Sequence, residues 1–88
     1  MKLTGKCKEE FEKYSNYLPS EFWKLPLEMQ IGVLILYFDS VGNHFDVYRK
    51  QGCYESNNNG YLGAWSTRKE AWTQAIEKAN EIRNEQLK

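Results

Sequence analysis

Two short turn signals constrain the fold of this chain more than any other feature of its sequence. Gln51-Gly52 and Asn59-Gly60 each have the composition of a two-residue hairpin loop, and Asn-Gly is the strongest signal of this kind. Each loop fixes how its flanking strands pair, so the first loop sets Lys50 opposite Cys53. The sequence therefore predicts a three-stranded antiparallel meander over residues 44–65.

The second loop sets Asn58 opposite Tyr61, and the two loops together divide the meander into two faces. The face expected to be apolar comprises Phe45, Val47, Tyr54, Tyr61 and Trp65, with Arg49 and Ser56 near its edges. The face expected to be polar comprises His44, Asp46, Tyr48, Lys50, Glu55 and Asn57, with Leu62 and Ala64. This separation predicts that the first face packs on helices and that the second faces water.

The segment before the meander begins with a predicted helix. Thr4 is a candidate N-cap. One face at helical spacing carries Cys7, Phe11, Tyr14 and Leu18. Pro19 is expected to end this helix, and a short turn follows through Trp23.

A second helix is predicted between Pro26, which suits a first helical turn, and Gly42, which suits the left-handed residue after a last turn. A strand is the alternative for Ile31–Phe38, because Val, Ile, Tyr and Phe favour strands. The length of the segment and the residues at its ends favour the helix. Its apolar residues surround nearly the whole helix, so it is expected to lie inside the fold or in a homodimer interface.

The last helix begins with a capping-box sequence, Thr67-Arg68-Lys69-Glu70. Its predicted buried stripe comprises Ala71, Trp72, Ala75, Ile76, Ala79 and Ile82. The order helix, helix, three strands, helix predicts a two-layer α+β fold, α-α-β-β-β-α. A chain of 88 residues has the length of a single domain, residues 1–88.

The residues that carry chemistry do not form a recognisable catalytic or metal site. Cys7, Cys53 and His44 lack the paired spacing that structural zinc sites use. Asp39, Ser40 and His44 are close in sequence, but a helix end and a strand start explain them without catalysis. We therefore predict no enzyme activity, no cofactor and no metal.

The composition favours a cytoplasmic protein that does not enter membranes. Two cysteines in 88 residues are too few for a secreted disulfide scaffold, so Cys7 and Cys53 are expected to be reduced, although the sequence leaves their oxidation open. The longest unbroken apolar run, Val33 to Phe38, is far shorter than the roughly 20 residues of a membrane helix. Lys and Arg together number 12, as do Asp and Glu, which argues against electrostatic anchoring to a membrane or to DNA.

Two kinds of binding surface are candidates. Five aromatic residues occur between Phe11 and Trp23, and Tyr17, Phe22 and Trp23 do not all fit on one helical face. Aromatic side chains are enriched in protein interfaces, although a small domain also uses them to fill its own core. We predict a protein-interaction surface at Tyr17, Phe22 and Trp23, for a protein partner that the sequence does not identify.

The alternative is weak binding of single-stranded nucleic acid on the polar sheet face. Tyr48 is placed to stack on a base. The expected phosphate contacts are Arg49, Lys50, Arg68 and Lys69. Asp46 and Glu55 share the face with Tyr48 and would repel phosphate.

Four groups of residues also carry a resemblance to a known set of proteins. They are Thr4-Gly5-Lys6 with Phe11-Glu12-Lys13; Leu25-Pro26 with Met29-Gln30 and Gly32-Val33; Phe38-Asp39-Ser40-Val41-Gly42; and Thr67-Arg68 with Glu70-Ala71 and residues 75–82. Together these resemble small hypothetical proteins of gut Bacteroides and of their phages and mobile elements. The resemblance implies a bacterial cytoplasmic setting and a phage or mobile-element origin, and it implies no catalytic or binding residues.

Overall fold

A computed structural model describes residues 3–58 and 60–88 of the chain. In chain order the elements are α1 (Gly5–Tyr14), α2 (Pro19–Phe22), α3 (Leu27–Ser40), β1 (Phe45–Lys50), β2 (Cys53–Asn58), β3 (Tyr61–Trp65) and α4 (Arg68–Gln86). The strands pair antiparallel in the order β1-β2-β3. The α+β class and the predicted order are confirmed, with the turn after α1 forming the four-residue helix α2.

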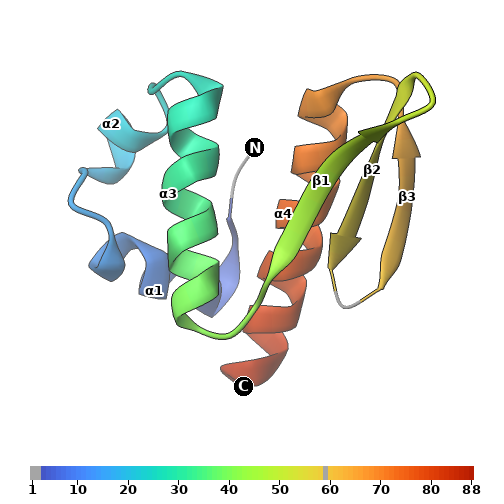
Figure 1. Ribbon diagram of the computed structural model, residues 1–88. Coiled ribbons are helices and arrows are strands. Elements are labelled where there is room, and N and C mark those ends of the chain that lie inside the picture. The colour runs from blue at the N-terminus through green and yellow to red at the C-terminus, as the bar shows by residue number, and fades with distance from the viewer. Residues whose placement is uncertain (1–2, 59) are drawn as a thin grey trace.

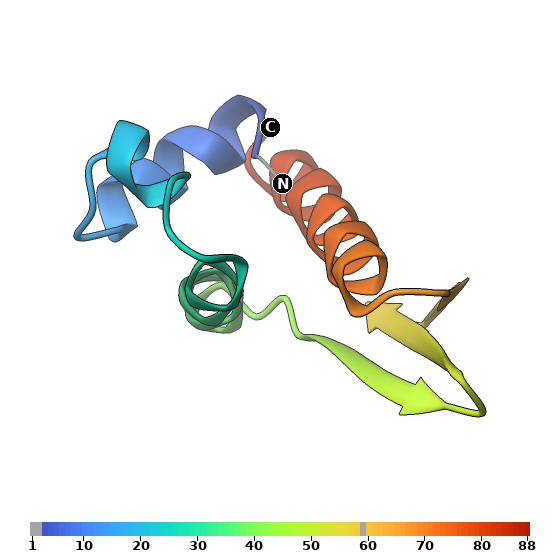
Figure 2. The same ribbon diagram turned by 90° about the horizontal axis from the view of Figure 1, so that it is seen from above.

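Helix α4 joins the two halves of the molecule. It contacts all three strands as well as α1 and α3. Figure 1 shows the sheet on one side of the molecule and α1, α2 and α3 on the other, with α4 behind β1. Seen from above, the sheet lies along α4, and α3 stands apart from the strands (Figure 2). One face of the sheet is thus covered by α4, and the other carries exposed residues such as Asp46 and Lys50.

The segment that contains Ile31–Phe38 is helical, so the strand alternative is excluded. Pro26 immediately precedes the helix with φ −53°. Gly42 follows it with φ +76°, a left-handed conformation that glycine adopts without strain. The proline and the glycine therefore mark the ends of α3, as the sequence predicts.

The β1–β2 register is confirmed, with Lys50 opposite Cys53. The β2–β3 register is correct from Tyr54 opposite Trp65 to Ser56 opposite Gly63, and then shifts at an irregularity after Ser56. The predicted loop residue Asn59 lies outside the described residues.

The shift sets Asn57, rather than Asn58, opposite Tyr61. Because one extra residue reverses the faces of a strand, two side-chain predictions are wrong. Tyr61 is 63% exposed instead of buried. Leu62, expected on the polar face, lines a hollow of about 180 Å³ against α4.

The contact between the sheet and α4 is made of small and polar side chains. Ala71 and Ala75 are fully buried on α4, and Ser56 is fully buried on β2. Asn58 Nδ2 donates a hydrogen bond of 3.4 Å to the Ala75 carbonyl, and Asn43 Nδ2 donates one of 2.9 Å to the Ala79 carbonyl. The sheet therefore lies close to the alanine stripe of α4.

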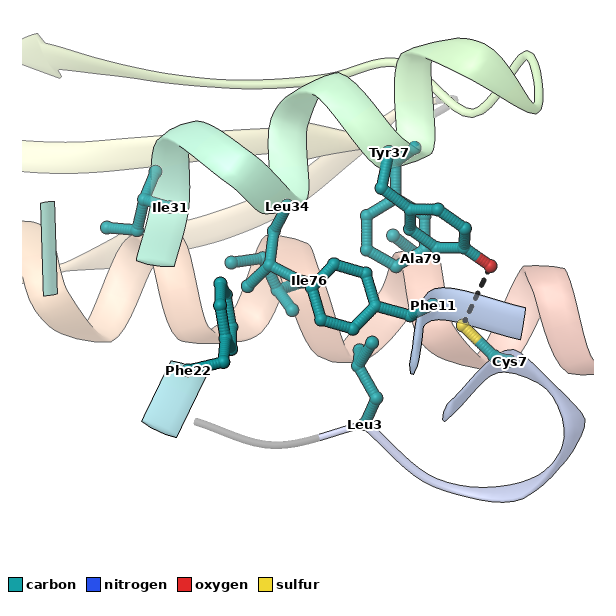
Figure 3. Close-up of a cluster of buried hydrophobic side chains, with 10 residues drawn as sticks. Leu3, Cys7, Phe11, Phe22, Ile31, Leu34, Tyr37, Ile76 and Ala79 are labelled. Atoms are coloured by element: carbon teal, nitrogen blue, oxygen red, sulfur yellow. Dashed lines mark hydrogen bonds between the residues drawn. The ribbon is translucent and has the colours of Figure 1, made fainter. Parts of the chain in front are cut away.

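The main apolar core lies between the helices rather than under the sheet. Its buried members are Leu3, Cys7, Phe11, Phe22, Ile31, Leu34, Tyr37, Phe38, Ile76 and Ala79. Figure 3 shows this cluster, whose side chains come from α1, α2, α3, α4 and the segment before α1 and point toward one another. By contrast, Phe45, Val47, Tyr54 and Trp65 of the sheet are only half-buried.

Helix α1 is shorter than predicted. It ends at Tyr14, so only Cys7 and Phe11 of its predicted apolar face are buried. Tyr14 and Leu18 are exposed. Thr4 occupies the N-cap position without capping through its side chain. Thr4 instead exchanges two hydrogen bonds with Asn80, which fasten the start of α1 to α4.

Among the described residues, no helix is both long enough and apolar enough to cross a bilayer.

Candidate protein-binding groove

One face of α3 is apolar and exposed. Leu36 is 62% exposed and Met29 is 47% exposed. Gly32 lies on the same face, and a Cβ built on it would meet no atom within 4 Å. The alternative that α3 is buried inside the fold on all sides is therefore wrong, because α1, α2 and α4 cover only the side that carries Ile31, Leu34 and Phe38. The other alternative, a homodimer interface on the exposed face, stays a prediction.

A groove of about 340 Å³ lies beside this face, which we call the tyrosine groove. Its lining residues are Tyr14, Ser15, Asn16, Tyr17, Val33 and Leu36. One wall comes from the end of α1 and the segment that follows it, and the other from α3. None of the lining residues carries a formal charge, so the groove suits an uncharged, largely apolar occupant.

The two tyrosines are held in place by core aromatic rings. The Tyr14 ring lies 5.4 Å from that of Tyr37, and the Tyr17 ring lies 6.0 Å from that of Phe22, centroid to centroid. The Tyr17 backbone N–H donates to Ser15 Oγ at 3.1 Å, which fixes the turn between the two rings. The groove is thus largely formed before any partner binds, which lowers the entropic cost of binding.

The structure divides the three residues predicted for protein interaction. Tyr17 lines the groove and is exposed. Phe22 is 1% exposed, so its side chain is unable to contact a partner and instead supports Tyr17. Trp23 is half-buried and packs edge to face on Phe22 at 4.7 Å. Of the three predicted residues, only Tyr17 is exposed on the surface; Phe22 is buried in the core, and Trp23 packs against the core.

The five residues proposed for nucleic-acid contact do not form one surface. Tyr48 and Lys50 lie on the open sheet face, and the Tyr48 hydroxyl donates to Glu55 Oε1 at 3.0 Å. Arg49 alternates to the other face, opposite Tyr54. Arg68 lies over that same Tyr54 ring, with Cζ 5.6 Å from the centroid.

Lys69 lies beside Arg68 at the start of α4. The arrangement therefore separates Tyr48, the predicted stacking residue, from Arg49 and Arg68, two of the predicted phosphate contacts.

The candidates for nucleophilic chemistry are also separated. His44 Nδ1 and Asp39 Oδ1 are 2.8 Å apart on the surface. Ser40 Oγ donates instead to the Tyr37 carbonyl at 2.6 Å, as a hydroxyl at a helix end commonly does. Within the described part of the chain, no three His, Cys, Asp or Glu side chains are grouped as metal ligands.

A polar network at the edge of the core joins α1, α3 and α4 and consists of Cys7, Glu10, Tyr37 and Arg83. Burial is the main reason that the pKa values of the Cys7 thiol and the Tyr37 phenol lie above their ordinary values. Hydrogen bonds from Arg83 are the main reason that the pKa of Glu10 lies below its ordinary value. The Cys7 sulfur is 3.8 Å from the Tyr37 hydroxyl and is buried, so the thiol is shielded from reagents.

Sequence reasoning missed Tyr14, Val33 and Leu36 as parts of the groove. The signal was present on α3, where Met29, Val33 and Leu36 follow helical spacing around an interior glycine, Gly32. A glycine in a helix interior costs roughly 0.5–1 kcal/mol relative to alanine, and an exposed apolar face is typical of interaction sites. Tyr14 carried no such signal, because its exposure depends on where α1 ends.

Compared with protein-family models, curated proteins and solved structures, the chain matches none.

Proposed function

We propose that this chain is a non-enzymatic protein-interaction module whose tyrosine groove binds an uncharged apolar segment of another protein. A cytoplasmic setting and a phage or mobile-element origin remain part of the same proposal. The observation that carries it is the pairing of a preformed groove with the exposed face of α3. Leu36 belongs to both, and it exposes 62% of its surface in a groove that Val33 and two tyrosines also line.

The apolar area at the groove is concentrated on three exposed side chains. Tyr14, Tyr17 and Leu36 line the groove and expose 43%, 37% and 62% of their surfaces. An aromatic side chain buries roughly 150–250 Å² when fully covered, so the two tyrosines alone expose on the order of 120–200 Å². Exposed apolar surface of this kind, rimmed by polar residues, is typical of interaction sites.

The tyrosine hydroxyls give the groove polar specificity as well as apolar area. Among the described residues, neither the Tyr14 nor the Tyr17 hydroxyl has a hydrogen-bond partner within the chain. Both rings are already braced, so a partner backbone is able to use these groups without first ordering them.

Photocrosslinking tests the proposal at one residue. A photoreactive benzoylphenylalanine replaces Leu36 in the full chain, and the same group replaces Tyr61 in a matched control. Tyr61 is equally exposed, at 63%, but lies on β3. The proposal predicts a discrete light-dependent adduct with one other protein from position 36 and none from position 61.

Three outcomes contradict the proposal. The first is the same adducts from both positions, and the second is no adduct from either. The third is an adduct of twice the chain's own mass, which identifies the exposed face of α3 as a homodimer interface instead.

A further inference from the structure

A second cavity lies at the other end of α3, away from the tyrosine groove. It has a volume of about 300 Å³, which is the lower end of the range for small-molecule sites. We call it the Trp72 cavity. Its lining residues are Leu27, Glu28, Ile31, Arg68, Lys69 and Trp72. The first two residues of α3 and the first two of α4 thus border one space.

The apolar wall of this cavity is rigid. Ile31 is buried in the helical core, and Leu27 packs against that core. The Trp72 ring stands edge to face on Phe45, with centroids 5.9 Å apart and planes at 78°. A flat or branched apolar group is therefore able to contact Leu27, Ile31 and Trp72 without rearranging them.

The rim of the Trp72 cavity carries an excess of positive charge. Arg68 and Lys69 face one carboxylate, Glu28, and none of the three forms an ion pair within the described residues. Glu70, the next residue of α4, does not line the cavity, and its Oε1 accepts hydrogen bonds from Thr67 and Ser66. Arg68 and Lys69 are therefore available to bind an anion.

Arg68 is also held in position. Its guanidinium Cζ lies 5.6 Å from the centroid of the Tyr54 ring, a cation–π contact, and Arg68 forms no ion pair within the described residues. Guanidinium edges match the two oxygens of a carboxylate. The first turns of α3 and α4 add their positive dipole ends to this field, since both helices begin at the cavity.

We propose that the Trp72 cavity binds an apolar carboxylate, a ligand with one aromatic or branched apolar group next to a carboxylate. The apolar group lies against Leu27, Ile31 and Trp72, and the carboxylate lies between Arg68 and Lys69. A free organic acid and the carboxyl end of a peptide with an apolar last residue share this chemistry. The apolar wall distinguishes such a ligand from a bare phosphate, which has nothing to place against it.

Titration of the full chain with three small probes tests the site. The probes are 3-phenylpropionate, its neutral amide and inorganic phosphate, and the readout is the NMR signal of the Trp72 indole N–H. A Trp72→Phe variant assigns that signal. We expect saturable binding of the carboxylate, at least fivefold weaker binding of the amide, and no saturation with phosphate.

Charge variants measure how much Arg68 and Lys69 contribute to carboxylate binding. Arg68→Gln with Lys69→Gln is expected to weaken carboxylate binding at least tenfold, whereas Lys78→Gln, elsewhere on α4, leaves it unchanged. Thermal unfolding of each variant confirms that it is folded. Equal binding of the acid and its amide, unchanged binding in the double variant, or the absence of saturation would each overturn the proposal.

Two further measurements fix the source and the independence of the site. Binding of the tripeptide Gly-Gly-Phe at least tenfold more tightly than 3-phenylpropionate supports a peptide carboxyl end, and the reverse order supports a free acid. Leu36→Glu alters the tyrosine groove and is expected to leave carboxylate binding unchanged. The proposal for the Trp72 cavity is therefore tested independently of the proposal for the tyrosine groove.

Discussion

Arg83 and Glu10 form a two-point ion pair that joins the last helix to the first. Arg83 Nε donates to Glu10 Oε1 and Nη2 donates to Oε2, both at 2.8 Å. The Tyr37 hydroxyl donates to the same Oε1 at 2.7 Å, so one carboxylate connects α1, α3 and α4. These three helices carry the core that supports the tyrosine groove, which makes Glu10 a structural residue of the site without lining it.

Replacing Glu10 with glutamine is expected to lower the free energy of unfolding by about 1 kcal/mol at neutral pH. The pair is two-point and partly shielded, with side-chain exposures of 18% for Arg83 and 34% for Glu10, which places it above an ordinary surface pair. Urea denaturation measures the change. Glu85→Gln, which breaks the exposed pair with Lys88, is the control and is expected to change stability by much less.

Acid should weaken the protein partly through Glu10. Hydrogen bonds from Arg83, followed by that from Tyr37, hold the pKa of Glu10 below its ordinary value in the folded state. The stabilisation is therefore present above the ordinary pKa of about 4.3 and is lost as pH falls through the lower folded-state pKa. Stability measured between about pH 5 and about pH 3 should fall less steeply for Glu10→Gln. Equal slopes would show that this carboxylate is not responsible.

Alkaline titration should reveal Tyr37 as a late-ionising tyrosine. Burial, and then its hydrogen bond to Glu10, raises the pKa of the phenol. Stability from this group is present below about pH 10 and is lost as pH rises toward the folded-state pKa. Ultraviolet absorbance should show one tyrosine that ionises only on unfolding. Tyr37→Phe should remove that step, and Tyr61→Phe should retain it.

Two glycines should respond oppositely to alanine. Gly32→Ala is expected to stabilise the free protein by about 0.5–1 kcal/mol, because the helix gains an alanine and the new Cβ meets nothing within 4 Å. Gly63→Ala is expected to destabilise it by about 1 kcal/mol or more, because φ is +150° and the new Cβ would lie 3.0 Å from the Trp65 ring. Thermal unfolding compares the two variants, and a change of the same sign in both contradicts this account.

Local signals in the sequence predicted much of the fold. Pro26 and Gly42 bound α3, and Thr67 accepts a hydrogen bond from the Glu70 backbone as a capping box requires. The first hairpin loop fixed its register because two residues leave only one pairing. These features depend on neighbours in the chain, which a sequence displays directly.

The sequence did not predict features that depend on tertiary packing. The irregularity after Ser56 places Asn57, rather than the expected Asn58, opposite Tyr61. The sequence pattern did not show which of the aromatic residues between Phe11 and Trp23 lie in the core, and Phe22 is one of them. Only the placement of α2 against α1 and α3 buries Phe22 and leaves Tyr17 in the groove.

The central claim is that the tyrosine groove binds a protein partner. The affinity of the Leu36→Glu variant for the crosslinked partner tests this claim most directly. Isothermal titration compares this variant with Tyr61→Glu, since the two residues are equally exposed and lie on different surfaces. The account predicts at least a tenfold loss of affinity for Leu36→Glu, equivalent to about 1.4 kcal/mol, and unchanged affinity for Tyr61→Glu. Unchanged binding by Leu36→Glu, or equal losses in both variants, would contradict the assignment of the tyrosine groove as the binding site.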